Sequence, residues 1–143
     1  MNIDLERFLN AQEEIYYDAL NEIKGGRKET HWMWFIFPQI KGLGMSETAI
    51  YYEISSLEEA KAYFNHEILG ERLLEIVNEL LSLDICNPEY IFGDIDSLKL
   101  KSSMTLFSYI SNNKIFDKVL EKYYDGKRDM KTIAICEELQ SQN

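Results

Sequence analysis

The sequence predicts an all-α fold, a compact bundle of about seven to nine short helices. Apolar residues recur every three or four positions along most of the chain, which is the spacing of a single buried helix face. No segment alternates convincingly between apolar and polar residues with the period of two that marks a half-buried strand. The 143 residues, 45% of them hydrophobic, suit one domain with its own core, so we expect a single helical domain over residues 1–143.

The first half of the chain is predicted to contain four helical segments. Residues 5–24 have helical periodicity, with Asp4 as the candidate cap and Gly25-Gly26 as the end. The run His31–Phe37 is short and uniformly apolar, so one or two buried helical turns fit it as well as a strand. A glycine-rich turn then leads into a helix at about 47–54. Ser56 and Glu59 form a capping box that opens a helix to about residue 64.

The second half is predicted to contain five more segments. A longer helix spans about residues 68–83. Asn87-Pro88 supplies a cap followed by proline at the first helical position, and the short turn that starts there stops at Gly93. Further helices are expected over about 96–110, 114–124 and 129–140, separated by Asn112-Asn113 and by Gly126.

Charge restricts the classes of partner. With 15 Lys+Arg against 25 Asp+Glu, the formal net charge is −10, which disfavours nucleic acid and anionic membrane surfaces. Nucleic-acid binding would require the scattered cations to form one stripe. The cations in question are Arg27, Lys28, Lys41, Lys99, Lys101, Lys127, Arg128 and Lys131. We therefore expect no nucleic-acid partner and no membrane association.

Motif content restricts the chemistry. The chain has two cysteines and two histidines without zinc-ligand spacing, and it has no metalloprotease, nucleophile-elbow or metal-carboxylate motif. No metal and no cofactor are expected. The acidic start does not resemble a signal peptide, and no apolar run approaches the roughly 18 residues of a membrane span. Together with the isolated cysteines, this predicts a cytoplasmic protein.

The aromatic run holds both tryptophans of the chain, Trp32 and Trp34. Large aromatic side chains most often anchor a core. The functional alternative is that one indole lines a pocket and stacks on a planar ligand. His31, just before the run, is either a structural hydrogen-bonding group or a proton-transfer residue, and it is the one candidate catalytic residue.

Two polar segments are candidates for binding an anion. The first contains Gln39, Lys41, Gly42, Gly44 and Ser46. It combines a cation with permissive glycines and a cap-type hydroxyl before a helix. An ordinary turn with a capped helix explains the same residues.

The second segment places cations and hydroxyls on one predicted helix, at Lys99, Lys101, Ser102, Ser103 and Thr105. Helical spacing allows Lys99 to converge with Ser102 and Ser103. Anion binding is favoured over a Ser–Lys nucleophile, because the order of the two residue types reverses the Ser-x-x-Lys motif. A solvated helix face remains the simpler interpretation of this pattern.

These segments resemble a known family. HWMWFIFPQIKGLG at 31–44 followed by Ser46, and LKLKSSMTLF at 98–107 with Ile91-Phe92-Gly93 upstream, are similar to the signature of an uncharacterised bacterial family, domain-of-unknown-function family 1810. The opening residues 5–12 and the late residues 126–132 agree in order and spacing. The resemblance implies a compact, mostly helical single domain and brings no established activity or catalytic residue. Similar sequences sometimes carry the label calpastatin, but that inhibitor is disordered and this composition is that of a folded chain.

Two functional hypotheses follow. The first is a small-molecule-binding domain in which the two polar segments meet at one pocket; its ligand is anionic, with a nucleotide as one candidate. Whether such a domain is an enzyme stays open. The second is a helical interaction module without ligand or catalysis, whose acidic surface contacts a basic partner protein. The first hypothesis predicts that the side chains of His31 and Lys99 lie within one pocket.

Overall fold

The computed structural model describes residues 3–142, and within them it contains eight helices and no strand. The predicted all-α class and the predicted number of helices are confirmed. The helices are α1 (Glu6–Lys24), α2 (Met33–Ile36), α3 (Glu47–Tyr52), α4 (Leu57–Asn65), α5 (Glu67–Ser82), α6 (Pro88–Ile110), α7 (Ile115–Tyr124) and α8 (Met130–Ser141). None of the helices within residues 3–142 is both long and apolar enough to cross a membrane.

Most helix ends follow from the capping residues in the sequence. The Ser56 hydroxyl accepts a hydrogen bond from the Glu59 N–H at 3.0 Å, which opens α4 as the capping box predicts. Asn87 caps α6 in the same way, with Pro88 at its first position. The expectation for Asp4 is wrong, because α1 begins after Leu5 without any side-chain cap. The Asp4 backbone carbonyl instead accepts a hydrogen bond from the Arg7 guanidinium.

Two ambiguous segments are resolved by the structure. The aromatic run forms a single helical turn, α2, instead of a strand. The segment from Pro88 to Ile110 is one long element with a kink at Gly93, where φ is 82°. This left-handed conformation suits glycine, which has no Cβ to clash. The short turn and the helix predicted on either side of Gly93 are therefore the two arms of α6.

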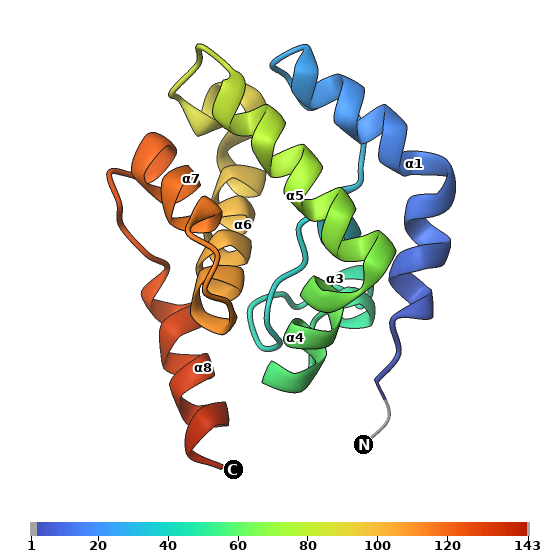
Figure 1. The fold of residues 1–143 in the computed structure, drawn as a ribbon, viewed down its shortest axis with the longest axis vertical. Coiled ribbons are helices and arrows are strands. Elements are labelled where there is room, and N and C mark those ends of the chain that lie inside the picture. The colour runs from blue at the N-terminus through green and yellow to red at the C-terminus, as the bar shows by residue number, and fades with distance from the viewer. Residues whose placement is uncertain (1–2, 143) are drawn as a thin grey trace.

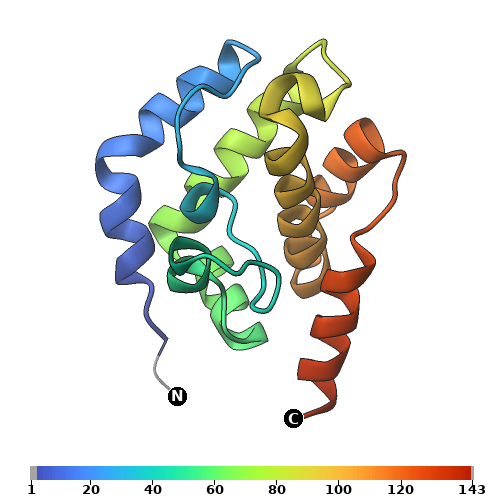
Figure 2. The same cartoon turned by 180° about the vertical axis from the view of Figure 1, so that it is seen from behind.

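The helices pack around a shared apolar centre. Helix α5 contacts both α1 and α7, and α6 packs against α7, α4 and α8. Figure 1 shows α5 crossing the front of the molecule with α6 behind it, and Figure 2 shows the chain before α3 in the space between α1 and α6. Aromatic rings fill the centre, where the Phe107 ring lies 5.5 Å from that of Tyr63 and 5.7 Å from that of Phe116.

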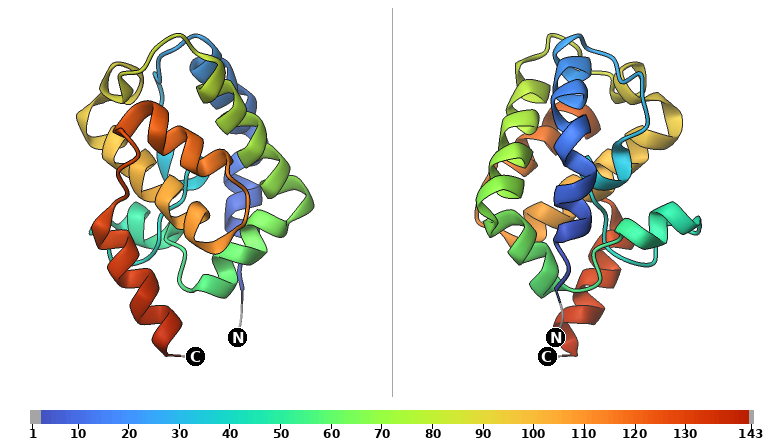
Figure 3. Two further views of the ribbon diagram at one scale, coloured as in Figure 1. Left: turned by 60° about the vertical axis from the view of Figure 1, so that its left-hand side comes forward. Right: turned by 90° about the vertical axis from the view of Figure 1, so that its right-hand side faces the viewer.

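Two parts of the chain stand out from this body. The start of α1 and the end of α8 lie at the same end of the molecule, and α8 extends past the other helices there (Figures 1 and 3). The segment that carries α3 projects sideways in the right-hand view of Figure 3. The surfaces between these two projections and α6 hold the candidate site.

Candidate functional site

The projecting segment 39–54 is closed at its base by backbone hydrogen bonds. The Lys41 N–H donates to the Ile54 carbonyl, and the Ile54 N–H donates to the Gln39 carbonyl, each at 2.9 Å. Ile40 and Ile54 pair in an isolated parallel bridge, and both are buried. These bonds tie both ends of the segment to the core.

The loop lies against α3 at Gly44. A Cβ atom added to Gly44 would lie 2.5 Å from the Cβ of Ala49, far inside van der Waals contact. Only glycine therefore permits this close approach. Gly44, Ala49 and Ser46 line one hollow together, and Ser46 is the N-cap of α3.

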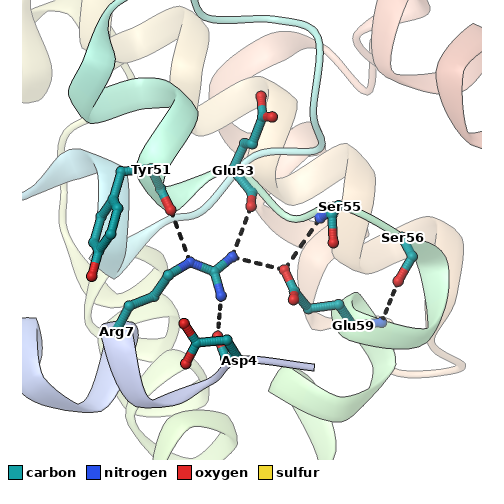
Figure 4. Close-up of polar contacts among 7 residues, drawn as sticks. All are labelled: Asp4, Arg7, Tyr51, Glu53, Ser55, Ser56 and Glu59. Carbon is teal, nitrogen blue, oxygen red and sulfur yellow. Dashed lines mark hydrogen bonds and ion pairs between the residues drawn. The ribbon is translucent and has the colours of Figure 1, made fainter. Parts of the chain in front are cut away.

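Arg7 fixes the other end of α3 (Figure 4). Its guanidinium donates to the carbonyls of Tyr51 and Glu53, at 2.9 and 2.8 Å, where α3 ends. It also pairs with the Glu59 carboxylate at 2.8 Å, and both side chains of this pair are buried. Helix C-termini leave backbone carbonyls unsatisfied, so a buried cation there stabilises the end of the helix. Arg7 of α1, paired with Glu59 of α4, thus binds the end of α3.

Helix α6 presents a stripe of four residues toward this segment. Ile95, Leu98, Lys99 and Ser102 are spaced i, i+3, i+4 and i+7, which places them on one helix face. Ile95 and Leu98 are 72% and 64% exposed, so they offer accessible apolar surface on this face. The stripe therefore combines accessible apolar surface with an ammonium group and a hydroxyl.

The start of α8 is pinned to α6 by Asp129. The Asp129 carboxylate caps α8 by accepting from the Thr132 N–H at 3.2 Å and from the Thr132 hydroxyl, and it also accepts from the Ser102 hydroxyl at 3.0 Å. The Asp129 N–H donates to the Thr105 hydroxyl at 3.0 Å. These bonds place Lys131, two residues into α8, beside the α6 stripe.

The three segments enclose a hollow of about 490 Å³, which we call the α6 hollow. Its lining comes from the loop before α3, from α3, from α6 and from the start of α8. The apolar part consists of Leu43, Gly44, Met45, Ala49, Ile95 and Leu98. The polar part consists of Gln39, Ser46, Lys99, Ser102, Asp129 and Lys131. The two polar segments singled out in the sequence thus meet here through Gln39, Gly44, Ser46, Lys99 and Ser102.

The two lysines of the hollow differ in their surroundings. The Lys99 ammonium lies 5.1 Å from the centre of the Trp34 ring and 3.6 Å from the Asp96 carboxylate. Asp96 also pairs with Lys28 at 3.0 Å. Lys131 is exposed, and within residues 3–142 no carboxylate pairs with it. Lys99 is therefore held in one place, whereas Lys131 is available to a ligand.

Three of the predicted site residues lie in the core instead. Trp32, Ser103 and Thr105 are fully buried, because α6 and the aromatic turn are covered on the sides where these residues lie. The Thr105 hydroxyl donates to the Lys101 carbonyl at 2.8 Å while accepting from Asp129. It thus joins α6 to the start of α8. A fully enclosed Trp32 offers no face on which a planar ligand could stack.

Trp32 is held by Glu22. The Glu22 carboxylate accepts from the Trp32 indole N–H at 2.9 Å and from the backbone N–H groups of Glu29 and Thr30 at 2.6 and 2.9 Å, and the Thr30 hydroxyl donates to it at 2.6 Å. Partial burial raises the pKa of the Glu22 carboxyl, but these hydrogen bonds together outweigh it and hold the pKa below its usual value. Glu29 and Thr30, which precede the aromatic turn, therefore have a structural role.

The remaining predicted residues lie around the α6 hollow without lining it. Trp34 is half-buried in a small gap behind Gly44 and Gln39, and Lys41 and Gly42 line a neighbouring groove. Lys101 is half-buried, and it lines neither the hollow nor the groove. His31 is exposed and is not among the residues that line the hollow at Lys99. The α6 hollow is therefore not a pocket shared by His31 and Lys99.

Comparison with known proteins identifies the family. The family described as "Protein of unknown function (DUF1810)" matches residues 2–136. The chain belongs to this family. Among solved structures, it is similar to the crystal structure of the conserved hypothetical protein Rv1873 from Mycobacterium tuberculosis, with 47% sequence identity and a TM-score of 0.92 over 94% of this chain and 97% of that one. No curated protein matches it significantly.

Several residues of the α6 hollow were not predicted from the sequence as site residues. Ile95 and Leu98 precede Lys99 on the same helix face, so the i, i+3, i+4, i+7 spacing was a usable signal. Asp129 was recognised as a helix start, but its bond to Ser102 joins positions 27 residues apart. Lys131 lines the same hollow as Gly44 and Met45 because of the way α8 packs. No local sequence pattern predicts this position.

Proposed function

We propose that this chain binds a small anionic molecule in the α6 hollow. The observation that supports the proposal is the meeting of Lys99 and Lys131, from two different helices, at one hollow of about 490 Å³. The whole chain carries a net charge of −10. Against the one carboxylate of the lining, Asp129, the two cations give the hollow a local excess of positive charge. An anion is the ligand that gains most from this arrangement.

The neutral polar groups of the hollow favour the same ligand. The Ser46 oxygen accepts from the Ala49 N–H at 3.1 Å, so its own O–H remains available as a donor. The side-chain amide of Gln39 carries two further N–H donors. The one carboxylate in the lining, Asp129, accepts from the hydroxyls of Ser102 and Thr132 through Oδ2, and these bonds offset part of its negative charge. The Ser46 hydroxyl and the Gln39 amide thus add neutral donors to the two ammonium groups of the hollow.

The apolar contacts in the hollow are aliphatic. Met45, Ile95 and Leu98 supply them, whereas Trp32 is enclosed and Trp34 has the Lys99 ammonium over its ring. The proposal therefore requires an anionic group and an apolar part, and it does not require a stacked nucleobase. It includes no catalytic step, since His31 does not line the hollow.

A thermal-shift screen tests the proposal. The panel contains inorganic phosphate, sugar phosphates, nucleotides and small carboxylates, and the best compound is then titrated by calorimetry. A ligand present at about 100 times its Kd raises the free energy of unfolding by about 2.7 kcal/mol, which is readily seen as an increase in Tm. We expect Lys131→Gln to weaken binding at least tenfold while leaving the fold intact, because Lys131 is exposed.

Lys118→Gln is the matched control. Lys118 is an exposed lysine of α7 outside the hollow, so this substitution removes the same charge elsewhere. The affinity of the Lys118→Gln variant for the selected compound should equal that of the wild type. Failure of the whole panel to stabilise the protein, or equal affinity in the Lys131 and Lys118 variants, contradicts the proposal.

The interaction-module hypothesis is the second candidate, and one observation favours it. Met45 is 93% exposed, and with Ile95 and Leu98 it forms accessible apolar surface around the hollow. Such surface often marks a protein contact. A partner that binds there would be lost with Met45→Gln and retained with Lys131→Gln, which is the opposite of what a small anion predicts.

A further inference from the structure

The α6 hollow opens toward a second, larger space along α8, which we call the α8 groove. The groove has a volume of about 680 Å³. Gly44 and Lys131 line both spaces, so the two adjoin at these residues. Lys131 therefore lies at the junction, in reach of a ligand in either one. A ligand held there by its charge has two directions in which to extend.

The floor of the α8 groove is aliphatic. Ile135 and Leu139 of α8 face it at one-turn spacing, and Ala134 and Ile50 line it beside them. Ile50 is 53% exposed, so burying it would be favourable. The Ile135 side chain also lies 3.6 Å from where a Cβ of Gly42 would be, which brings α8 up to the loop before α3. The groove thus offers aliphatic surface beside a cation, Lys131.

Along α8, the charges that line the groove run from a cation to an anion. Glu138 lies seven residues beyond Lys131, about 10 Å along the helix. On the opposite wall, Lys41 lies beside Glu53, whose carboxylate also lines the groove and accepts from the Gly42 N–H at 3.3 Å. A ligand with negative charge at one end only matches this order, and a second negative charge at its far end would meet Glu138.

We propose that the ligand is an amphipathic anion, an acyl or alkyl chain with one carboxylate or phosphate group at one end. The anionic group lies between Lys99 and Lys131 in the α6 hollow, and the apolar chain lies in the α8 groove over Ala134, Ile135 and Leu139. This inference rests on the proposed function, because the anionic group occupies the same site. It adds the chemical class of the ligand and the direction in which it lies.

A series of carboxylates of increasing length tests the inference. Acetate, butyrate, hexanoate and octanoate are titrated into the full chain, with binding followed by calorimetry or by NMR. Each methylene buried in the groove should strengthen binding about twofold to fourfold. Hexanoate should bind at least tenfold more tightly than 1-hexanol, which lacks the charge, and more tightly than adipate, which carries a second carboxylate at the end near Glu138.

Ala134→Phe supplies the decisive variant. It fills the groove with a ring while leaving the α6 hollow unchanged, so it should abolish the dependence on chain length and leave acetate binding as it was. Gln140→Phe is its control, because Gln140 is an exposed residue of the same helix outside the groove. In this control the length dependence should equal that of the wild type.

The other outcomes separate the two claims. Equal affinity for acetate and octanoate overturns the assignment of the chain to the groove and leaves the anion site standing. A length dependence that persists in Ala134→Phe places the chain elsewhere and overturns the inference as well. Failure of every carboxylate, and of every other anion in the thermal-shift panel, to bind overturns the proposed function with it. Concentration-dependent dimers that Ala134→Phe abolishes, seen by light scattering, would show a second copy covering the groove and would also overturn the inference.

Discussion

The ammonium group of Lys99 lies 5.1 Å from the centre of the Trp34 ring. Lys28 lies over Trp32 at 5.2 Å in the same manner, and the Asp96 carboxylate pairs with both lysines. One carboxylate of α6 thus holds two cations over the two indoles of the chain. This places a spectroscopic reporter, Trp34, beside a lysine of the proposed site.

Replacement of Lys99 should therefore change the fluorescence of Trp34. Lys99→Met removes the charge over the indole, so the emission maximum and intensity should shift, whereas Lys118→Met should leave the spectrum unchanged. The difference should vanish in a Trp34→Phe background, because the Lys99 ammonium is placed over Trp34 and Trp32 has its own lysine. Identical spectra for the wild type and Lys99→Met would contradict the placement of Lys99.

The buried ion pair between Arg7 and Glu59 should contribute strongly to stability. Arg7→Met leaves the Glu59 carboxylate buried without its partner, so we expect the free energy of unfolding to fall by about 3–5 kcal/mol in urea titrations. The combined Arg7→Met/Glu59→Met variant should lose less than the sum of the single variants, because no uncompensated charge remains.

The exposed pair of Arg128 and Asp117 is the control for this experiment. Its N–O distance is 3.0 Å, but both side chains reach solvent. Arg128→Met should therefore cost less than about 1 kcal/mol. A similar small loss for Arg7→Met would show that Arg7 does not hold the end of α3.

Glu22 should give stability a specific dependence on pH. Its hydrogen bonds from Thr30, Glu29 and Trp32 lower the pKa of the folded state relative to the unfolded state. The stabilisation is therefore fully present above the unfolded-state pKa, about 4.3, and is lost as the pH falls through the lower pKa of the folded state.

Glu22→Gln tests this dependence. The variant should be less stable than the wild type by about 1–2 kcal/mol at neutral pH, since charge-assisted hydrogen bonds are lost. The difference should shrink as the pH falls below the unfolded-state pKa and through the lower pKa of the folded state. Glu137→Gln, at an exposed position of α8, should show neither effect. A difference that stays constant from pH 7 to pH 3 would contradict the role of the carboxylate.

The two cysteines should react at very different rates. Cys86 is exposed, whereas Cys136 is fully buried and burial raises the pKa of its thiol to about 11. A thiol-reactive dye should label one cysteine per native chain quickly and two in urea, since the thiolate is the reactive form. Cys86→Ser should remove the rapid phase. Rapid labelling of both thiols in the native state would show that α8 is not packed as described.

The sequence predicted the helices well where local residues decide them. Ser56 and Asn87 cap their helices as their spacing indicated, and Gly93 interrupts α6 where a turn was expected to stop. The prediction that Asp4 caps α1 was wrong, because α1 has no side-chain cap and Arg7 instead donates to the Asp4 backbone carbonyl. Capping depends on neighbours within a few residues, so it can be predicted from sequence to that extent.

The site was predicted only in part, since burial depends on which helices pack together. Helical spacing predicted that Lys99 converges with Ser102 and Ser103, yet Ser103 is fully buried and Ser102 donates to Asp129 at the start of α8. The two polar segments that the sequence patterns singled out both line the α6 hollow, through Ser46 and Lys99 among others. These patterns contained no signal for the position of Lys131, which is set by the packing of α8.

The central claim is that an anion binds between Lys99 and Lys131, and NMR shift mapping with hexanoate tests it most directly. The backbone amide resonances of Gly44, Ser46, Lys99, Ser102 and Lys131 should shift together with one Kd. The shifts should continue along α8 to Ile135 and Leu139, and they should be lost in Lys131→Gln. Shifts that cluster away from these residues, or that persist unchanged in Lys131→Gln, would contradict the claim.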